Sequence, residues 1–321
     1  MLFLGKKTET MFIPSPLPAL DNPLAWGRDE YVPSKVVSQD LDSRQGRRSC
    51  SSLQCTSSWT SPWRNRKRPL FEDQWGCSGR CVLSFVRTAV RRESARYSDG
   101  AGIPHRHRIP LGLLMLSQGW ITNPQLQHAL DFQRQNGGRI GDILVDECGL
   151  TPEKVTRGLG MQWSCPILGL TGFSAHEMSF VVPRPLVDQL GFVPLRIAGS
   201  KILYLGFEEH LDASAALALE QMSGLKVESG IMPTEEYQAV RSQLLERQGI
   251  ELKQETFRET DAMAARITAI LEHAQPVASR LVRVGRFYWL RLWLEPAVLR
   301  GAGVVPVTDE DMLDYVFTTE D

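Results

Sequence analysis

The chain has no long uninterrupted run of apolar residues. Nowhere in its 321 residues do about 18 apolar side chains follow one another, which is the length that a membrane-spanning helix needs. Near the start, Lys6, Lys7 and Glu9 interrupt the apolar residues before they reach the length of a signal-peptide core. We therefore expect a cytoplasmic protein without a membrane span.

Excess charge and cysteine are scarce as well. Lysine and arginine number 36 against 37 aspartates and glutamates, so no global field favours nucleic acid or an anionic membrane. Six cysteines are too few for a disulfide scaffold in a chain of this length, although four gather between Cys50 and Cys81. With 42% hydrophobic residues, the chain can still build at least one sizeable core.

The residue strings that mark common catalytic sites are also missing. Gly224-Leu225-Lys226-Val227 lacks the loop and the hydroxyl of the phosphate-binding G-x4-G-K-[ST] motif, and no other stretch supplies them. The strings H-E-x-x-H, G-x-S-x-G and G-x-G-x-x-G are absent too. His105 and His107 could contact a metal or a phosphate, but we interpret them as part of a solvated linker. We expect no catalysis.

An internal repeat is the most informative feature of the sequence. Residues 110–133 and 139–162 align without gaps at an offset of 29, with a five-residue spacer between them. The first copy reads PLGLLMLSQGWITNPQLQHALDFQ and the second RIGDILVDECGLTPEKVTRGLGMQ. Their apolar spacing predicts a short helix, a turn and a second helix in each copy.

The residues between the two helices of each copy support this prediction. Thr122 and Thr151 stand where an N-cap side chain would accept hydrogen bonds from the first free amides of the second helix. Gly119 and Gly149 stand where the first helix should end.

A duplicated hairpin could simply be a small helical bundle, and the leucines alone favour that interpretation. It accounts less well for Gly112 and Gly141 near the start of each first helix, where glycine costs roughly 1 kcal/mol relative to alanine. It also leaves unexplained why Gln133 and Gln162 close the two copies at the same offset.

The remaining sequence predicts an α+β protein in which tandem helical hairpins pack on a small α/β half-domain. Strands are expected at residues 192–195 and 202–206, a helix at 82–90, and helical, charged sequence at 247–275. A strand hairpin is expected at 280–294, turning at Gly285-Arg286. The expected segments are a mobile arm (1–45), a cysteine-rich segment (46–97), a linker (98–108), the repeat with its half-domain (109–246), and a helix with a strand hairpin (247–321).

The pattern R-L-G-x-x-(L/V)-(V/I)-x-x-G-(L/I)-(L/I)-x4-L-x3-L-x2-Q, present twice, resembles the cyclic di-GMP motif of the GspE and MshE family. These are the N-terminal domains of type II secretion and type IV pilus assembly ATPases. The resemblance covers roughly residues 105–246, because 181–187, 191–195, 201–205 and 224–227 resemble the second half of that domain. It implies a cyclic di-GMP-binding domain without the ATPase.

By resemblance, the residues that face the ligand come from both copies and from the end of a later strand. Asp142 resembles an acid of the family that accepts from the guanine edge, and arginine can stack on guanine or meet phosphate. The implied set is Arg108, Leu111, Gly112, Gln133, Arg139, Ile140, Gly141, Asp142, Gln162 and Glu209.

Three positions depart from the family pattern. Pro110 replaces the arginine of the first copy, although Arg108 lies two residues upstream and could provide the cation. Cys148 occupies the glycine position of the second copy, with Gly149 one place later. Glu209-His210 stands where the family often has Asp-Pro.

The cysteine cluster resembles a treble-clef zinc knuckle, in which the second pair of cysteines opens a helix. Four thiolates suit tetrahedral zinc, but both pairs are spaced more widely than the common C-x2-C. The alternative is four unpaired cysteines in a poorly ordered arm, and the sequence favours neither. The ligands would be Cys50, Cys55, Cys77 and Cys81.

The sequence is therefore compatible with two functions. The first is a cytoplasmic cyclic di-GMP effector that alters a surface read by a secretion, pilus or signalling protein. The second is an adaptor that docks on a secretion or pilus component without nucleotide. Basic residues interleaved with tryptophans in segment 46–97 would permit nucleic-acid binding, but a charged surface around a metal knuckle explains them more simply.

Overall fold

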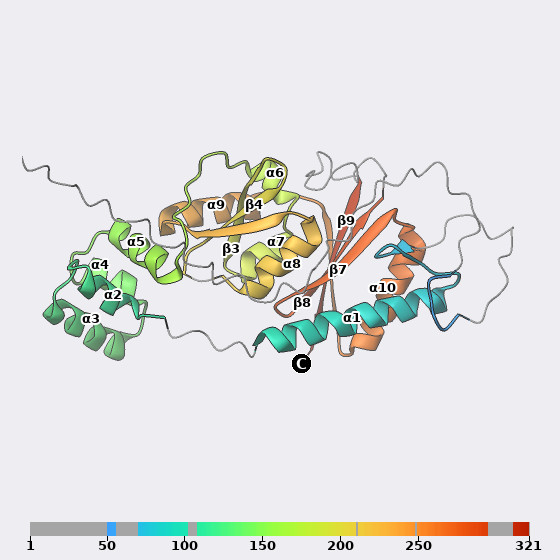
Figure 1. Cartoon of the computed structure of the whole chain (residues 1–321), viewed down its shortest axis with the longest axis horizontal. Coiled ribbons are helices and arrows are strands. Elements are labelled where there is room, and N and C mark those ends of the chain that lie inside the picture. Colours follow the sequence, from blue (N-terminus) through green and yellow to red (C-terminus); the bar gives the residue numbers. More distant parts are fainter. Residues whose placement is uncertain are drawn as a thin grey trace, which may run out of the picture. The chain divides into compact units, whose positions relative to one another are not determined.

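The computed structural model describes residues 50–55, 70–101, 108–209, 211–247, 249–294 and 311–320. Helices and strands both contribute, as predicted for an α+β protein (Figure 1). The predicted arm (1–45), His105 and His107, and the basic and aromatic residues between 56 and 69 lie outside the described residues.

The two repeat copies form two helical hairpins, as predicted. The first hairpin consists of α2 (Leu111–Ser117) and α3 (Asn123–Asn136), and the second of α4 (Ile140–Asp146) and α5 (Pro152–Trp163). Their apolar side chains share one core, which includes Met115 and Leu144 at equivalent positions of the two copies. The four helices form one group in Figure 1.

The turns inside the hairpins follow the predicted pattern with one difference. Gly119 and Gly149 adopt left-handed backbone at φ +68° and +69°, which glycine accepts without a steric cost. Thr122 caps α3 and forms a capping box with Gln125. Thr151 also precedes its helix but makes no capping bond, and Lys154 stands where the first copy has the reciprocal Gln125.

The half-domain is a three-stranded sheet with helices around it. Strands β3 (Phe192–Ala198) and β4 (Ile202–Phe207) are antiparallel, and α8 (Ala213–Ser223) leads from β4 to the parallel strand β5 (Lys226–Ile231). Both predicted strands are confirmed. Three further helices belong to the half-domain: α6 (Ala175–Ser179) and α9 (Thr234–Glu246), which contact β3, and α7 (Arg184–Gln189), which contacts α9.

A second sheet has the order β6-β9-β8-β7. The predicted hairpin is confirmed as β7 (Ala278–Val284) and β8 (Phe287–Trp293), with Gly285 at φ +58°. The helical prediction for residues 247–275 holds for α10 (Thr260–Ala274) but is wrong for β6 (Glu251–Phe257). Pairing of β6 with the unpredicted strand β9 (Met312–Thr319) overrides the helical character of its charged residues.

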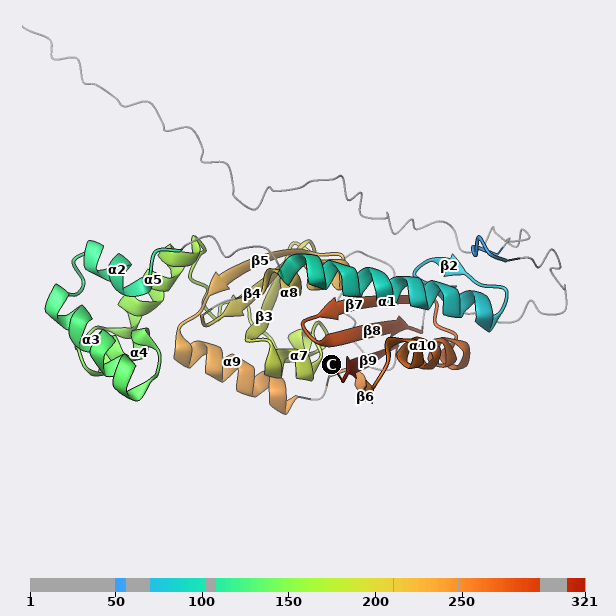
Figure 2. The same cartoon turned by 90° about the horizontal axis from the view of Figure 1, so that it is seen from below.

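Helix α1 (Gly79–Ala101) packs with α10 on one face of this second sheet (Figures 1 and 2). A small hairpin of β1 (Leu70–Phe71) and β2 (Gln74–Trp75) precedes it, so residues from the two ends of the chain share one core. The predicted helix at 82–90 is confirmed. Residues 98–101 of the predicted linker continue α1, which includes Gly100, because one glycine costs a long helix only about 1 kcal/mol.

The opposite face of the second sheet contacts the half-domain core through residues such as Val284, Phe287 and Trp289. Beside them lies a buried ion pair. Arg291 donates to both oxygens of Asp314 at 2.8 and 2.7 Å, and the Trp289 indole N–H donates to Asp314 at 3.0 Å. Arg291 is 5% exposed and Asp314 1%. Such a pair orders β8 against β9 because either charge alone would be stranded in the core.

Substitution of Asp314 by Ala should therefore lower the free energy of unfolding by about 3–5 kcal/mol, because Arg291 would remain buried and unpaired. Urea denaturation of the full chain measures this loss. As a control, Asp131→Ala removes an exposed pair with Arg134 and should change the same quantity by less than about 1 kcal/mol. Equal losses of unfolding free energy in the two variants would contradict the stabilising role of the buried Arg291–Asp314 pair.

Candidate functional site

The two closing glutamines exchange hydrogen bonds between the hairpins. The Gln133 amide donates to the carbonyl of Gly138 at 2.9 Å, and the Gln162 amide donates to the carbonyl of Ile109 at 2.8 Å. Gly138 and Ile109 are themselves separated by the repeat offset, and each immediately precedes the N-cap residue of α4 or α2. Each copy thus holds the start of the other, which gives the hairpin pair an approximate two-fold symmetry.

The two glycines serve close packing inside each hairpin. A Cβ on Gly112 would lie 2.5 Å from Cδ1 of Leu126, and a Cβ on Gly141 would lie 2.9 Å from Cγ1 of Val155. Leu126 and Val155 are equivalent positions of the repeat. A packed helical bundle therefore accounts for both glycines, although the sequence alone indicated that it accounts for them less well.

The N-cap positions of α2 and α4 differ in chemistry. Pro110 and Arg139 occupy them with similar extended backbone, at φ −54° and −87°. The Arg139 guanidinium donates to Glu208 at 2.7 Å and approaches Glu209 at 2.9 Å, both just after β4. Burial of Arg139 opposes its charged form, but Glu208 and then Glu209 outweigh this effect and raise the pKa of Arg139. The structure thus brings together Arg139 and Glu209.

Arg108 lies at the other half of the hairpin pair. Its guanidinium carbon is 3.2 Å from the centroid of the Trp163 ring, and Trp163 in turn meets Phe207 edge to face at 5.7 Å. This arrangement places a stacked cation and an aromatic ring beside the start of α2, since Gln162 next to Trp163 bonds Ile109.

The remaining predicted residues fall into two groups. Leu111, Gly112 and Gly141 are buried in the hairpin core, and Ile140 is half-buried against it. Asp142 is exposed in the first turn of α4. The exposed polar set therefore centres on Arg139, Asp142 and Glu209, whereas the buried residues shape the backbone beneath it.

Sequence reasoning missed Glu208 and Trp163. Glu208 is the less exposed partner of Arg139, at 12% side-chain exposure against 45% for Glu209. Both missed residues are sequence neighbours of predicted ones, Glu209 and Gln162. Spacing in the sequence does not predict which of two neighbouring side chains points toward the site.

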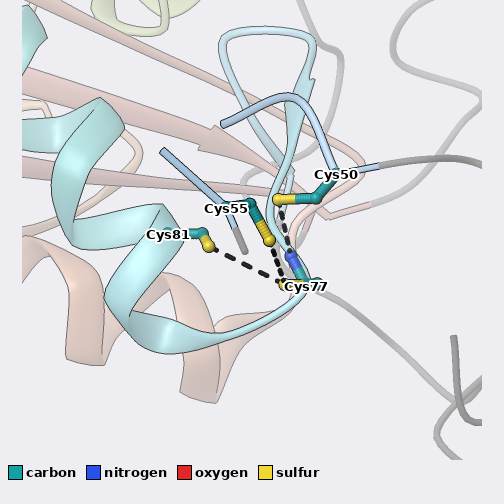
Figure 3. A group of neighbouring side chains, drawn as sticks. All are labelled: Cys50, Cys55, Cys77 and Cys81. Atoms are coloured by element: carbon teal, nitrogen blue, oxygen red, sulfur yellow. Dashed lines mark hydrogen bonds between the residues drawn. The ribbon is translucent and has the colours of Figure 1, made fainter. Parts of the chain in front are cut away.

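The four predicted cysteines lie together (Figure 3). Their sulfur atoms all fall within 4.8 Å of one another, with Cys55–Cys77 at 3.4 Å and Cys77–Cys81 at 3.7 Å. The backbone N–H of Cys77 also donates to the Cys50 sulfur at 3.4 Å. Cys81 stands in the first turn of α1, as the knuckle prediction required.

The cysteine thiols differ in how readily they ionise. Burial raises the pKa of Cys77 to about 12, and hydrogen bonds with neighbouring sulfurs add to the increase. Burial also opposes ionisation of Cys81, but hydrogen bonds from Ser78 and the other cysteines outweigh it and lower the pKa to about 7. Of these two thiols Cys81 therefore ionises more readily, and the thiolate is the form that binds metals.

No helix in the described part of the chain combines the length and apolar character that crossing a bilayer requires. This finding concerns only helices within those residue ranges.

Comparison with known proteins gives partial matches. No protein-family model matches the chain. The type IV pilus assembly ATPase PilB of Myxococcus xanthus is 30% identical over 94 residues, which are 29% of this chain and 17% of that protein. PilB of Thermus thermophilus is 24% identical over 120 residues, 37% of this chain and 14% of that protein. The chain thus spans less than a fifth of the length of these curated relatives, and the matches confirm the predicted resemblance.

Solved structures also align with part of the chain. A structure of MshE with cdg has 24% identity and a TM-score of 0.37, covering 43% of this chain and 99% of that one. The N-terminal domain of XpsE has 13% identity and a TM-score of 0.30, covering 41% of this chain and 92% of that one.

The packing role of the glycines predicts that Gly112→Ala destabilises the chain by about 1–3 kcal/mol, despite the better helix propensity of alanine. The new methyl group would overlap Leu126, which is 4% exposed and has little room to move. Thermal unfolding of the full chain measures the change. Gly169→Ala is the control, because its nearest neighbour would lie at 3.9 Å. An unchanged Tm for Gly112→Ala would contradict the packing account.

Proposed function

We propose that this chain carries a domain related to the N-terminal domains of type II secretion and type IV pilus assembly ATPases, and that it is a non-catalytic cyclic di-GMP effector. The observation that carries the proposal is the approximate two-fold symmetry of the hairpin pair, which rests on the exchanged bonds of Gln133 and Gln162. Cyclic di-GMP is itself two-fold symmetric. A duplicated hairpin therefore offers two similar half-sites to a ligand with two similar halves.

The proposed contacts use the exposed polar set. Arginine has five N–H donors, and the hydrogen bond to Glu208 uses one, so donors remain for a phosphate or a guanine. Asp142 is exposed in the first turn of α4 and has two acceptor oxygens for the N–H groups of a guanine edge. Glu208 and Glu209 hold the Arg139 guanidinium at the end of β4. Because this side chain is already ordered, ligand binding would cost less conformational entropy.

Binding at this position would affect two parts of the structure at once. Arg139 belongs to the second hairpin and Glu208 to the half-domain, so the ion pair joins them across the end of β4. A ligand that contacts Arg139 would compete with or reinforce this junction. The surface that changes is the one we propose a cytoplasmic secretion, pilus or signalling protein reads.

A second candidate function is an adaptor that docks on such a protein without nucleotide. Exposed apolar side chains at the start of α2 favour it, since Ile109 is 62% exposed and Leu113 52%. The two functions differ in one measurable property: adaptor binding to the partner would be unaffected by cyclic di-GMP.

Calorimetric titration of the full chain with cyclic di-GMP tests the leading proposal. We expect binding at micromolar or lower Kd, weakened about 10- to 100-fold by Arg139→Ala, because a charge-assisted hydrogen bond is lost. Arg258→Ala removes the same charge from an exposed residue directly after β6 and should leave Kd unchanged. The absence of any binding heat, together with an unchanged thermal transition at saturating ligand, would leave only the adaptor function.

We also propose that the cysteine cluster binds a structural zinc ion. Zinc with Zn–S bonds of about 2.3 Å holds tetrahedral sulfurs about 3.8 Å apart, close to the sulfur distances in this cluster. Cys50, Cys55, Cys77 and Cys81 would be the ligands, and their number fills a closed structural site. Zinc would stabilise the thiolate forms and offset part of their negative charge at the start of α1.

The cluster adjoins the edge of the second sheet through the β1–β2 hairpin. Phe71 is 1% exposed in the core, and Ser279 of β7 donates to the carbonyl of Leu70 at 3.2 Å. Glu72 accepts from the backbone N–H of Leu281 at 3.3 Å, so it occupies a donor on the outer edge of β7. Zinc at the cluster would hold this covering hairpin in place.

Purified full chain should therefore contain about one zinc ion per molecule, and its chelation should lower the Tm. Cobalt substituted for zinc should show sulfur-to-metal charge-transfer absorption that Cys77→Ser weakens. Cys148→Ser is the control, because Cys148 lies against the hairpin core away from the cluster. A chain purified in zinc-containing medium with no stoichiometric metal would contradict the site.

A further inference from the structure

The two halves of the hairpin pair have matching backbones but unlike exposed side chains. We propose that they select different bases, guanine at Asp142 and adenine at Leu113, so that the preferred ligand is a mixed guanine–adenine cyclic dinucleotide. This inference rests on the proposed function and exchanges one of the two guanines of its ligand for adenine.

The backbone equivalence of the halves is well supported. Pro110 and Arg139 are both N-cap residues in extended conformation, and the carbonyls preceding them accept the paired glutamine bonds. Positions 113 and 142 therefore both lie in the first turn of a seven-residue helix, α2 or α4. A two-fold ligand aligned with this symmetry presents one base to each position.

The second half has the groups that recognise guanine. Asp142 is exposed and acidic, and Arg139 lies at the N-cap three residues before it. The guanine edge carries the N1–H and the N2 amino group as neighbouring donors, which a carboxylate accepts together. Adenine has an acceptor in place of N1–H, so Asp142 would face its lone pair and reject it.

The first half has no such acceptor side chain. Leu113 replaces the carboxylate and is 52% exposed, and Ile109 beside it is 62% exposed. Pro110 replaces the arginine and has no backbone N–H to offer. What remains is a surface for apolar contact, together with Arg108 stacked over Trp163 at 3.2 Å.

Against Leu113, the two purines differ in how many polar groups lose water. Guanine would bring its O6, N1–H and N2 amino groups towards an apolar side chain, and unpaired buried donors are costly. Adenine has a smaller polar edge, N1 and the N6 amino group, and the same stacking face. The first half should therefore favour adenine, whereas the second requires guanine.

Titration of the full chain with three cyclic dinucleotides tests this order. The mixed guanine–adenine ligand should bind about tenfold more tightly than cyclic di-GMP. Cyclic di-AMP should bind more weakly than the mixed ligand, by a factor of about ten or more. Tightest binding of cyclic di-GMP by the native chain would overturn the inference and leave the proposed function intact. No binding of any of the three would overturn both.

A swap variant isolates the contribution of position 113. Leu113→Asp gives both halves a carboxylate, so the affinity ratio of cyclic di-GMP to the mixed ligand should rise by about tenfold. The added charge repels the phosphates of both ligands alike, so this ratio is the informative quantity. Leu217 on α8 is also exposed in the native chain, at 51%, so the control variant Leu217→Asp should leave the ratio unchanged. An unchanged ratio in folded Leu113→Asp, checked by its circular dichroism and Tm, would overturn the proposal.

Discussion

The reciprocal hydrogen bonds of Gln133 and Gln162 are the constraint on which the proposed ligand site depends. Each glutamine closes one copy of the repeat and donates to the backbone just before the other copy. The start of each hairpin is therefore positioned by the other hairpin. Gly112 and Gly141 complete this arrangement by allowing the helices of each hairpin to approach closely. The result is a frame with two equivalent N-cap positions, and the chemistry of the proposed site depends on which residue occupies each: proline in one copy and arginine in the other.

Much of the hairpin region could be predicted from sequence because its signals are local. The repeat offset, the glycines at the turns and the threonine before α3 each specify a conformation within a few residues. The role of the glutamines could not be predicted, since their partners, Gly138 and Ile109, lie just outside the two aligned copies. Glu208 was missed for a related reason: its approach to Arg139 depends on how β4 ends beside α4, which no spacing in the sequence reports.

The C-terminal region shows the limit of local signals more sharply. Residues 251–257 have the charged composition of a surface helix, yet they form β6 because β9, some sixty residues later, pairs with them. The cysteine cluster was predicted as a group, whereas its position at the β7 edge follows from Phe71 and Glu72, which contact residues more than two hundred positions away. Packing at that distance joins the beginning and the end of the described chain into one core.

The proposed function requires that one ligand contacts both repeat copies at once. Hydrogen–deuterium exchange of the full chain, with and without a saturating cyclic dinucleotide, measures this directly. We expect slower amide exchange at the starts of both α2 and α4, around residues 109–113 and 139–142, and at the end of β4. Protection confined to one hairpin, or exchange unchanged in both while the ligand is bound elsewhere, would contradict it.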